Sequence, residues 1–176
     1  MTQSDDLGRV VIPKEIRRTL RLREGTPLEI FTDREGEIIL KKYSPMVELA
    51  AFAVQYAEAM AQSTGLMVCI ADRDQIIAVS GGPKKEYYQK TISRALEHVI
   101  QERTVIQAGK EDRNFTPVTD DDGDSITAQV ITPIICEGDA IGAVIIMSRE
   151  PRAKFSDPEL RLAATAAGFL GRQMES

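Results

Sequence analysis

A break at residues 41–45 divides the sequence into two parts of unequal size. An apolar, strand-like run ends there in Lys41 and Lys42, and the Ser44-Pro45 pair that follows interrupts regular structure. Residues 1–43 are too few to bury much of a core alone. Nine aliphatic side chains in this part nevertheless require burial: Val10, Val11, Ile12, Ile16, Leu20, Leu28, Ile30, Ile38 and Leu40. Two copies that share one core would bury them, so the sequence predicts a dimer through its first part.

The first part has the pattern of a short helix followed by a hairpin. Gly8 to Ile12 is a short β-branched run, and Pro13 then precedes a two-turn helix expected over residues 14–20. Strands are expected at residues 28–32 and 37–43, because the turn residues 33–36 lie between two apolar runs. This part is therefore expected to be rich in β-structure.

The second part alternates helices with pairs of strands. Helices are expected at residues 46–61 and 91–102 and after Ser156, which can form a capping box with Glu159. Strands are expected at residues 66–71, 75–80, 125–136 and 140–148. This order predicts an α+β fold with an antiparallel sheet and flanking helices. The expected domains are residues 1–43 and residues 44–176.

Charge is distributed unevenly between the two parts. Residues 1–43 hold nine Lys and Arg against eight Asp and Glu, whereas residues 44–176 hold thirteen against nineteen. The expected first helix places Lys14 and Arg18, and also Arg17 and Arg21, four residues apart. With Arg9 just ahead of the helix, these cations could contact phosphates and read bases. Spacing alone equally permits a solvated helix face paired with Glu15 and Glu24.

A resemblance to known families bears on this choice. Residues 6–20, with the sequence DLGRVVIPKEIRRTL, resemble the signature of the AbrB-type swapped-hairpin DNA-binding domain, and residues 28–31 and 38–43 continue it. Residues 44–176 resemble the GAF-type sensor domain of the stage V sporulation protein T family. The resemblance implies that two chains exchange hairpins and that Arg9, Arg17 and Arg18 contact double-stranded DNA. Family members carry a further strand with basic residues before this stretch. Only residues 1–4 precede Asp5, so we expect that first strand to be missing.

Other motifs in the second part give weak signals for chemistry. The run Gly81-Gly82-Pro83-Lys84-Lys85 could hold an anion or form a solvated turn. The acidic run at residues 120–124 lacks the end ligands of a calcium loop and is expected to be a turn. His98 is the single histidine, and Cys69 and Cys136 lie in apolar runs. We expect both cysteines to be packing residues, and we expect no catalytic residue, cofactor or metal site.

Two helices with few charged positions point to further assembly. The helix expected at residues 46–61 is apolar on most sides, and the last helix carries Ala163, Ala164, Ala166, Ala167, Gly168 and Gly171. We expect both to pack against their counterparts in a second chain, which together with the first part would give a tetramer. The alternative is that both helices lie on one monomeric core.

These patterns and the resemblance together predict a sporulation-type transcription regulator with a possible small-molecule effector. No apolar run approaches the ~20 residues that span a bilayer, and no signal peptide is evident, so a cytoplasmic location without membrane contact is expected. Two alternatives remain open at this point. One is a small-molecule-binding GAF enzyme with a basic appendage, and the other is an antitoxin with a DNA-binding domain of this type.

Overall fold

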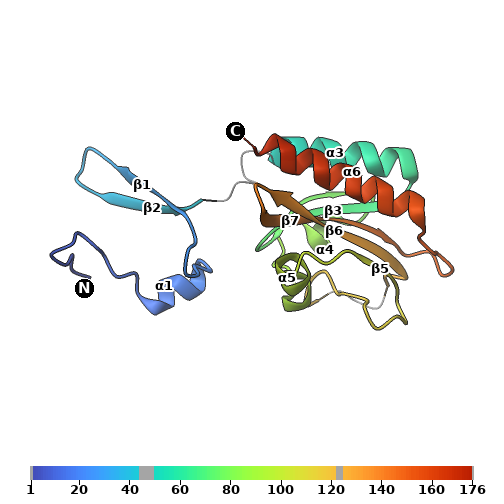
Figure 1. Ribbon diagram of the computed structural model, residues 1–176, viewed down its shortest axis with the longest axis horizontal. Coiled ribbons are helices and arrows are strands. Elements are labelled where there is room, and N and C mark those ends of the chain that lie inside the picture. The colour runs from blue at the N-terminus through green and yellow to red at the C-terminus, as the bar shows by residue number, and fades with distance from the viewer. Residues whose placement is uncertain (1, 44–49, 122–124, 176) are drawn as a thin grey trace. The chain divides into compact units, whose positions relative to one another are not determined.

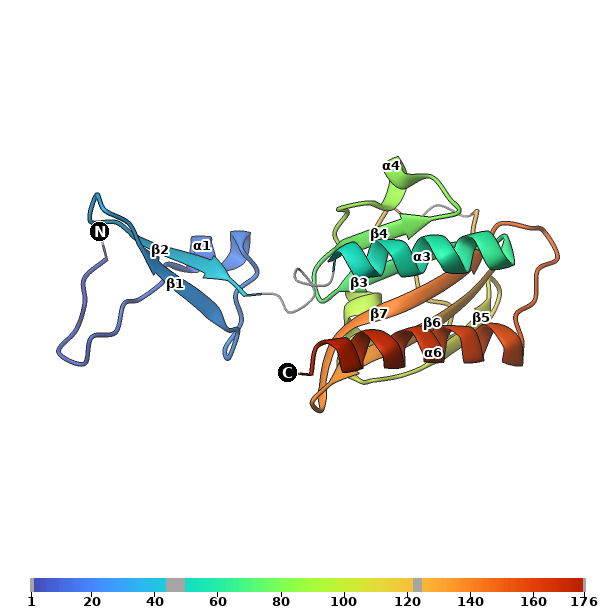
Figure 2. The ribbon, with the colours of Figure 1, turned by 90° about the horizontal axis from the view of Figure 1, so that it is seen from above.

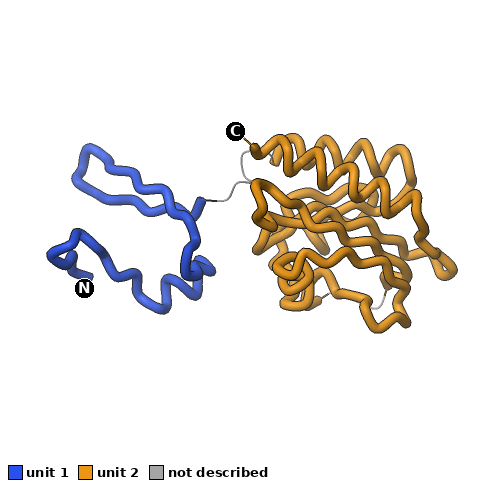
Figure 3. The backbone as a smooth tube through the Cα atoms, in the orientation of Figure 1, with its two compact units in different colours: residues 1–44 blue, residues 45–176 orange. Residues whose placement is uncertain are grey.

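A computed structural model describes residues 2–43, 50–121 and 125–175. The chain divides into two compact units, Met1–Ser44 and Pro45–Ser176, which Figure 3 distinguishes by colour. Each unit is described separately below. No helix within the described residues is long and apolar enough to cross a membrane.

The first unit contains one short helix and one hairpin (Figure 1). Helix α1 spans Lys14–Thr19, strand β1 spans Leu28–Thr32 and strand β2 spans Ile38–Lys42. The two strands pair antiparallel, with Ile30 opposite Leu40. The β-branched run at residues 8–12 forms no strand within this chain, and only Val10 makes a single antiparallel bridge, to Ser4. The predicted helix and hairpin are therefore both present.

Most apolar side chains of the first unit stay in contact with solvent. Helix α1 has no buried residue. Seven of the nine side chains that the sequence marks for burial are exposed, from Leu40 at 40 % to Val11 at 72 %; the others are Val10, Ile16, Leu20, Ile30 and Ile38. Ile12 and Leu28 are only half-buried. One copy of this unit therefore has no hydrophobic core of its own.

The second unit is built on a five-stranded antiparallel sheet in the order β4-β3-β7-β6-β5. Its strands are β3 (Met67–Asp72), β4 (Ile76–Ser80), β5 (Ile106–Gly109), β6 (Ala128–Cys136) and β7 (Asp139–Ser148). Its helices are α3 (Ala50–Thr64), α4 (Lys84–Tyr87), α5 (Arg94–Gln101) and α6 (Asp157–Gln173). This confirms the predicted α+β fold with flanking helices.

Side chains on the two faces of the sheet form two separate cores. One face packs against α3 and α6, which run antiparallel in front of the sheet in Figure 2, and it includes Val68, Val130 and Val144. The opposite face, which includes Ile131, packs against Tyr87 of α4, Leu96 of α5 and the following loops. The central strand β7 is buried on both faces except at Asp139. The unit thus has three layers with the sheet in the middle.

Local signals explain where several elements begin. The Ser156 amide donates to Glu159 Oε2 at 2.8 Å, which is half of the predicted capping box at the start of α6. Helix α5 begins later than the predicted residue 91, because Ser93 is its N-cap and accepts from the Leu96 amide at 3.0 Å. The sequence patterns missed α4 and β5, which have only four residues each.

Candidate nucleic-acid interface

Helix α1 carries three of the five predicted DNA contacts. Lys14, Arg17 and Arg18 are all exposed on it. Neither Arg17 nor Arg18 has an ion-pair partner among the residues described, so the predicted alternative of pairing with Glu15 or Glu24 is not observed there. The helix is short, but Pro13 pre-sets its first turn and accepts a hydrogen bond from the Arg17 amide at 3.0 Å. These cations project from the surface without a competing carboxylate.

Arg21 lies where the chain turns away from α1. The Leu22 amide donates to the Arg17 carbonyl at 2.7 Å, and the Arg21 amide donates to the Arg18 carbonyl at 3.2 Å. This pair of bonds is the Schellman ending of a helix, which requires a left-handed residue at the position of Arg21. Arg21 has a φ of 53°. Glycine would avoid a cost of roughly 1 kcal/mol at such a position, so the arginine occupies a strained backbone.

Arg9 lies in a separate turn ahead of α1 and is paired with Asp5. Its Nε is 2.7 Å from Asp5 Oδ2, and both side chains are exposed. Asp5 Oδ1 also accepts from the amides of Leu7 at 3.0 Å and Arg9 at 2.9 Å. These bonds, above all that from the Arg9 amide, hold the pKa of the Asp5 carboxyl below its ordinary value. Asp5 is therefore ionised at neutral pH and competes with phosphate for Arg9. The Asp-Arg spacing of four residues was the sequence signal for this contact.

Replacing Asp5 with asparagine is expected to tighten DNA binding about threefold to tenfold near 0.15 M salt. The Asn amide oxygen can keep the two backbone hydrogen bonds of the turn, while the negative charge next to Arg9 is lost. Fluorescence anisotropy with a labelled duplex measures the change. Asp6→Asn is the matched control, since Asp6 is an exposed neighbour with the same charge. Equal tightening by both variants would show that release of Arg9 contributes nothing.

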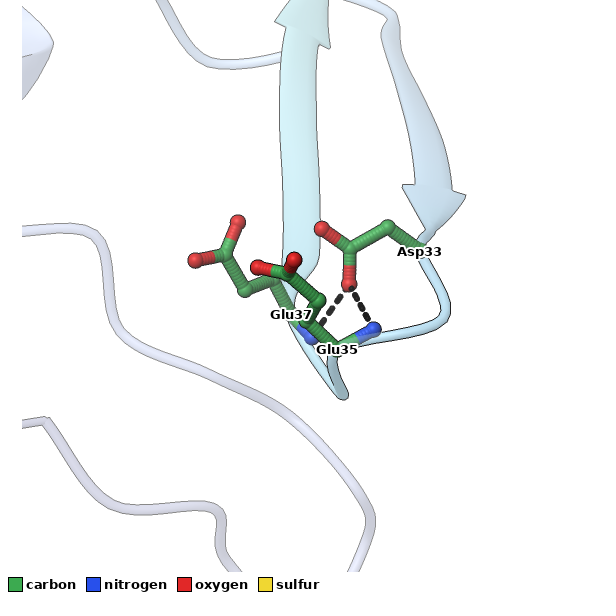
Figure 4. A group of neighbouring side chains, drawn as sticks. All are labelled: Asp33, Glu35 and Glu37. Carbon is green, nitrogen blue, oxygen red and sulfur yellow. Dashed lines mark hydrogen bonds between the residues drawn. The ribbon is translucent and has the colours of Figure 1, made fainter.

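Three carboxylates gather at the tip of the β1–β2 hairpin, as Figure 4 shows. Asp33, Glu35 and Glu37 are exposed, and their oxygens lie within 4.8 Å of one another. Asp33 Oδ1 accepts from the amides of Glu35 at 3.0 Å and Glu37 at 2.9 Å. The Glu37 amide is the main reason why the pKa of the Asp33 carboxyl is lowered. The Asp33 carboxylate thus stabilises the turn by accepting these hydrogen bonds, and the three carboxylates place negative charge at the hairpin tip.

The second unit holds the remaining residues that the sequence singled out for possible chemistry, namely the two cysteines, His98 and the acidic run. Cys69 and Cys136 are both buried, as expected of packing residues. Burial is the main cause of the raised pKa of the Cys136 thiol, which leaves it protonated and a poor nucleophile. His98 is exposed on α5. The acidic run at residues 120–124 falls largely outside the described residues.

Comparison with protein families places both parts of the chain. Residues 48–175 match the family described as the stage V sporulation protein T C-terminal domain, a transcription factor. Residues 1–47 match the family described as antidote-toxin recognition MazE, a bacterial antitoxin. The chain is also similar to the GAF domain of a putative membrane protein from Geobacter sulfurreducens. That comparison has a TM-score of 0.54 and 15 % identity and covers 73 % of this chain and 93 % of the other. It confirms the GAF-like fold of the second unit.

Two proteins of Bacillus subtilis are similar in sequence. The transition state regulatory protein AbrB is 63 % identical over 41 residues, which cover 23 % of this chain and 42 % of that protein. This confirms the AbrB-like character of the first part. Stage V sporulation protein T is 52 % identical over 172 residues, which cover 97 % of this chain and 94 % of that protein. The similarity includes both units, which neither an isolated antitoxin domain nor a GAF enzyme would explain. The chain therefore belongs to the stage V sporulation protein T family of transcription factors.

Proposed function

We propose that two copies of residues 1–43 form one DNA-contact surface through which this regulator controls sporulation genes. The contacts are Arg9, Lys14, Arg17, Arg18 and Arg21 of each copy. The observation that carries the proposal is the arrangement of α1, whose exposed cations stand beside the unburied apolar side chains Ile16 and Leu20. Apolar side chains favour a protein partner and cations favour phosphate, so one short helix can serve both.

The exposed apolar side chains of the hairpin support a second copy as that protein partner. Ile30 is 68 % and Ile38 71 % exposed, which is unusual for β-strand residues in a folded unit. An exchanged hairpin would bury them against the same side chains of the other copy. It would also build the core that 43 residues cannot build alone. DNA-contact residues of both copies would then be fixed on one rigid body.

The strained backbone at Arg21 is a further reason to include it among the DNA contacts. An arginine costs stability where a glycine would fit, and such costs concentrate at functional positions. The Lys42 ammonium donates to the Arg21 carbonyl at 3.4 Å, which ties the helix end to strand β2. A cation at this point would be held in a fixed place relative to the hairpin.

The second unit is proposed to join dimers into a tetramer through the outer side of α3 and α6. Phe52 remains 49 % exposed on α3 and Phe169 remains 38 % exposed on α6. Phe169 stacks on Tyr56 of α3 with ring centroids 5.2 Å apart, so the two helices share one aromatic patch. Ala164 and Gly168 are exposed on the same helix as Phe169 and would permit close helix packing. A bundle of these helices from two chains would cover the patch.

We infer that the second unit senses an effector and does no chemistry of its own, and that the regulator acts in the cytoplasm. Membership of a transcription-factor family supports this, and so does the burial of both cysteine thiols, which keeps them from a substrate. The similarity across both units favours this function over an antitoxin or a GAF enzyme.

Selection of bound sequences from a random duplex pool tests the proposed function. The full chain is expected to enrich a short sequence, which then binds at least about 1,000-fold more tightly than unselected duplex at physiological salt. Such a ratio is typical of specific DNA-binding proteins. No enrichment after several rounds, or equal affinity for selected and unselected duplex, would contradict sequence-specific DNA binding.

A further inference from the structure

A pocket of about 570 Å³ lies in the second unit, on the side of the sheet that carries α4 and α5. Its walls come from α4, from Lys90 after α4, from Thr119, Asp121 and Ser125, and from Arg149 just after β7. Figure 2 shows α4 beside strand β4 at this edge of the unit. Pockets of 300–1,000 Å³ are typical for small organic ligands, so the volume suits a metabolite better than a bare ion.

Three of the five charged side chains among the described residues that line the pocket are cations. Lys85, Lys90 and Arg149 line it together with two carboxylates, those of Glu86 and Asp121. Glu86 is already engaged, because its Oε2 accepts from Arg149 Nη2 at 2.7 Å. Neither Lys85 nor Lys90 forms an ion pair with any residue that the structure describes. Among the described lining residues, this leaves the two lysines and one further carboxylate, that of Asp121.

Arg149 lines the pocket with an exposed side chain that is held by two neighbouring side chains. Tyr87, which is only 2 % exposed, forms a hydrogen bond with the Arg149 guanidinium in addition to the bond from Glu86. An arginine has five N–H donors in a planar fork, so these two contacts do not use all of its hydrogen-bonding capacity. A guanidinium placed in advance loses little conformational entropy when an anion binds.

The remaining walls are anchored to the core by backbone hydrogen bonds. The Gln89 amide donates to the Ile76 carbonyl at 2.9 Å, and the Ile76 amide donates to the Lys90 carbonyl at 3.0 Å. On the other side, the Gln129 side chain donates to the Thr116 carbonyl at 2.8 Å and accepts from the Thr116 amide at 2.6 Å. The loop then reaches Thr119, which bridges to Ile92. These contacts fix the positions of Lys90 and Thr119 relative to the rest of the unit.

The sequence left open whether the run Gly81-Gly82-Pro83-Lys84-Lys85 holds an anion or forms a solvated turn. Its residues have different roles in the structure. A side chain at Gly81 would collide with the Leu66 carbonyl, and one at Gly82 would collide with the Met67 side chain. The glycines therefore permit close packing on β3, and they do not cradle a ligand. Lys85 at the end of the run does line the pocket, whereas Lys84 is not among the lining residues.

We propose that this pocket binds a small organic anion, one that carries a phosphate or carboxylate group, through Lys85, Lys90 and Arg149. The hydroxyl groups of Thr119 and Ser125 would supply neutral donors beside the charged ones. The proposal names the chemical class of the effector and rests on the proposed sensing function only for its biological consequence. Binding of the anion itself is independent of DNA.

Nuclear magnetic resonance titration of the full chain tests the pocket with three probes: inorganic phosphate, glucose 6-phosphate and citrate. At least one organic anion is expected to cause saturable chemical-shift changes at Lys85, Lys90 and Ser125, with a Kd below about 10 mM. That limit corresponds to a binding free energy of about 3 kcal/mol. Comparison of the two organic probes distinguishes a phosphate from a carboxylate ligand, while glucose is the neutral control. No saturable shift with any of the three anions would overturn the proposal.

Charge-removing variants then locate the site. Lys85→Gln combined with Lys90→Gln is expected to weaken binding at least about tenfold, because charge-assisted hydrogen bonds are lost. Lys84→Gln is the matched control and should bind as the parent does. Equal affinity of the double variant and the parent would also overturn the proposal. Unchanged DNA binding by the unliganded double variant separates this result from the proposed function, since each can fail while the other holds.

Discussion

Replacing Arg9, Arg17 and Arg18 together with alanine is expected to weaken DNA binding at least about 100-fold near 0.15 M salt. In a symmetric dimer the triple variant loses up to six phosphate contacts, and each contact contributes about 0.9 to the slope of log affinity against log salt concentration. All three side chains are exposed, so the fold should survive their truncation. Anisotropy titrations at several salt concentrations measure both the affinity and the slope, and circular dichroism checks the fold.

A matched control removes the same charge from the other unit. Arg152, Lys154 and Arg161 are also exposed, and their joint replacement with alanine should leave DNA affinity within about threefold of the parent, since none of them is among the proposed phosphate contacts. If the Arg9, Arg17 and Arg18 variant binds DNA as tightly as the parent, the assigned surface is wrong. If both triple variants weaken binding equally, net charge and not a local surface determines affinity.

Phe169→Glu is expected to convert a tetramer of the full chain into a dimer. The substitution places a carboxylate on the aromatic patch of Phe52, Tyr56 and Phe169, where burial in a helix bundle would leave the charge without a partner. The dimer proposed for the first unit should persist, because none of its residues is changed. Multi-angle light scattering on the eluted peak gives the mass of each species.

A second substitution and a control distinguish assembly from folding. Phe52→Glu lies on the other helix of the patch, is more exposed than Phe169 and should have the same effect. Tyr88→Glu changes an aromatic side chain of similar exposure, 47 %, near α4 and should leave the tetramer intact. A parent chain that elutes as a dimer, or a Phe169→Glu chain that remains tetrameric with an unchanged melting temperature, would contradict the bundle.

Periodicity and turn chemistry were enough to predict most of the fold. The hairpin of the first unit follows from two apolar runs around residues 33–36, and β6 and β7 follow from long apolar runs around a Glu137-Gly138 turn. The start of α6 follows from the Ser156 and Glu159 pair. Helix α4 and strand β5 could not be predicted, because four residues give no measurable period and tertiary contacts decide their conformation.

The candidate surfaces were predictable to different degrees. The cations of α1 could be predicted as DNA contacts, because their four-residue spacing is visible in a short stretch of sequence and the resemblance to the AbrB-type domain is specific. The four-residue spacing of Asp5 and Arg9 hinted at their contact, whereas the left-handed backbone at Arg21 emerges only from the geometry of its turn. The anion pocket could not be foreseen, because it unites residues from α4 with Arg149, which lies more than sixty positions along the chain from Glu86. Long-range proximity of this kind is set by the order of strands in the sheet.

The salt dependence of DNA binding by the parent chain tests most directly whether two copies form one contact surface. Five contacts from a single chain would give a slope of about −4.5 in log affinity against log salt concentration, and ten contacts from two chains would give about −9. We expect a slope steeper than about −5, which the five cations of one chain cannot supply. A slope of about −4.5 or shallower, which the five cations of one chain can supply, would contradict a shared DNA-contact surface.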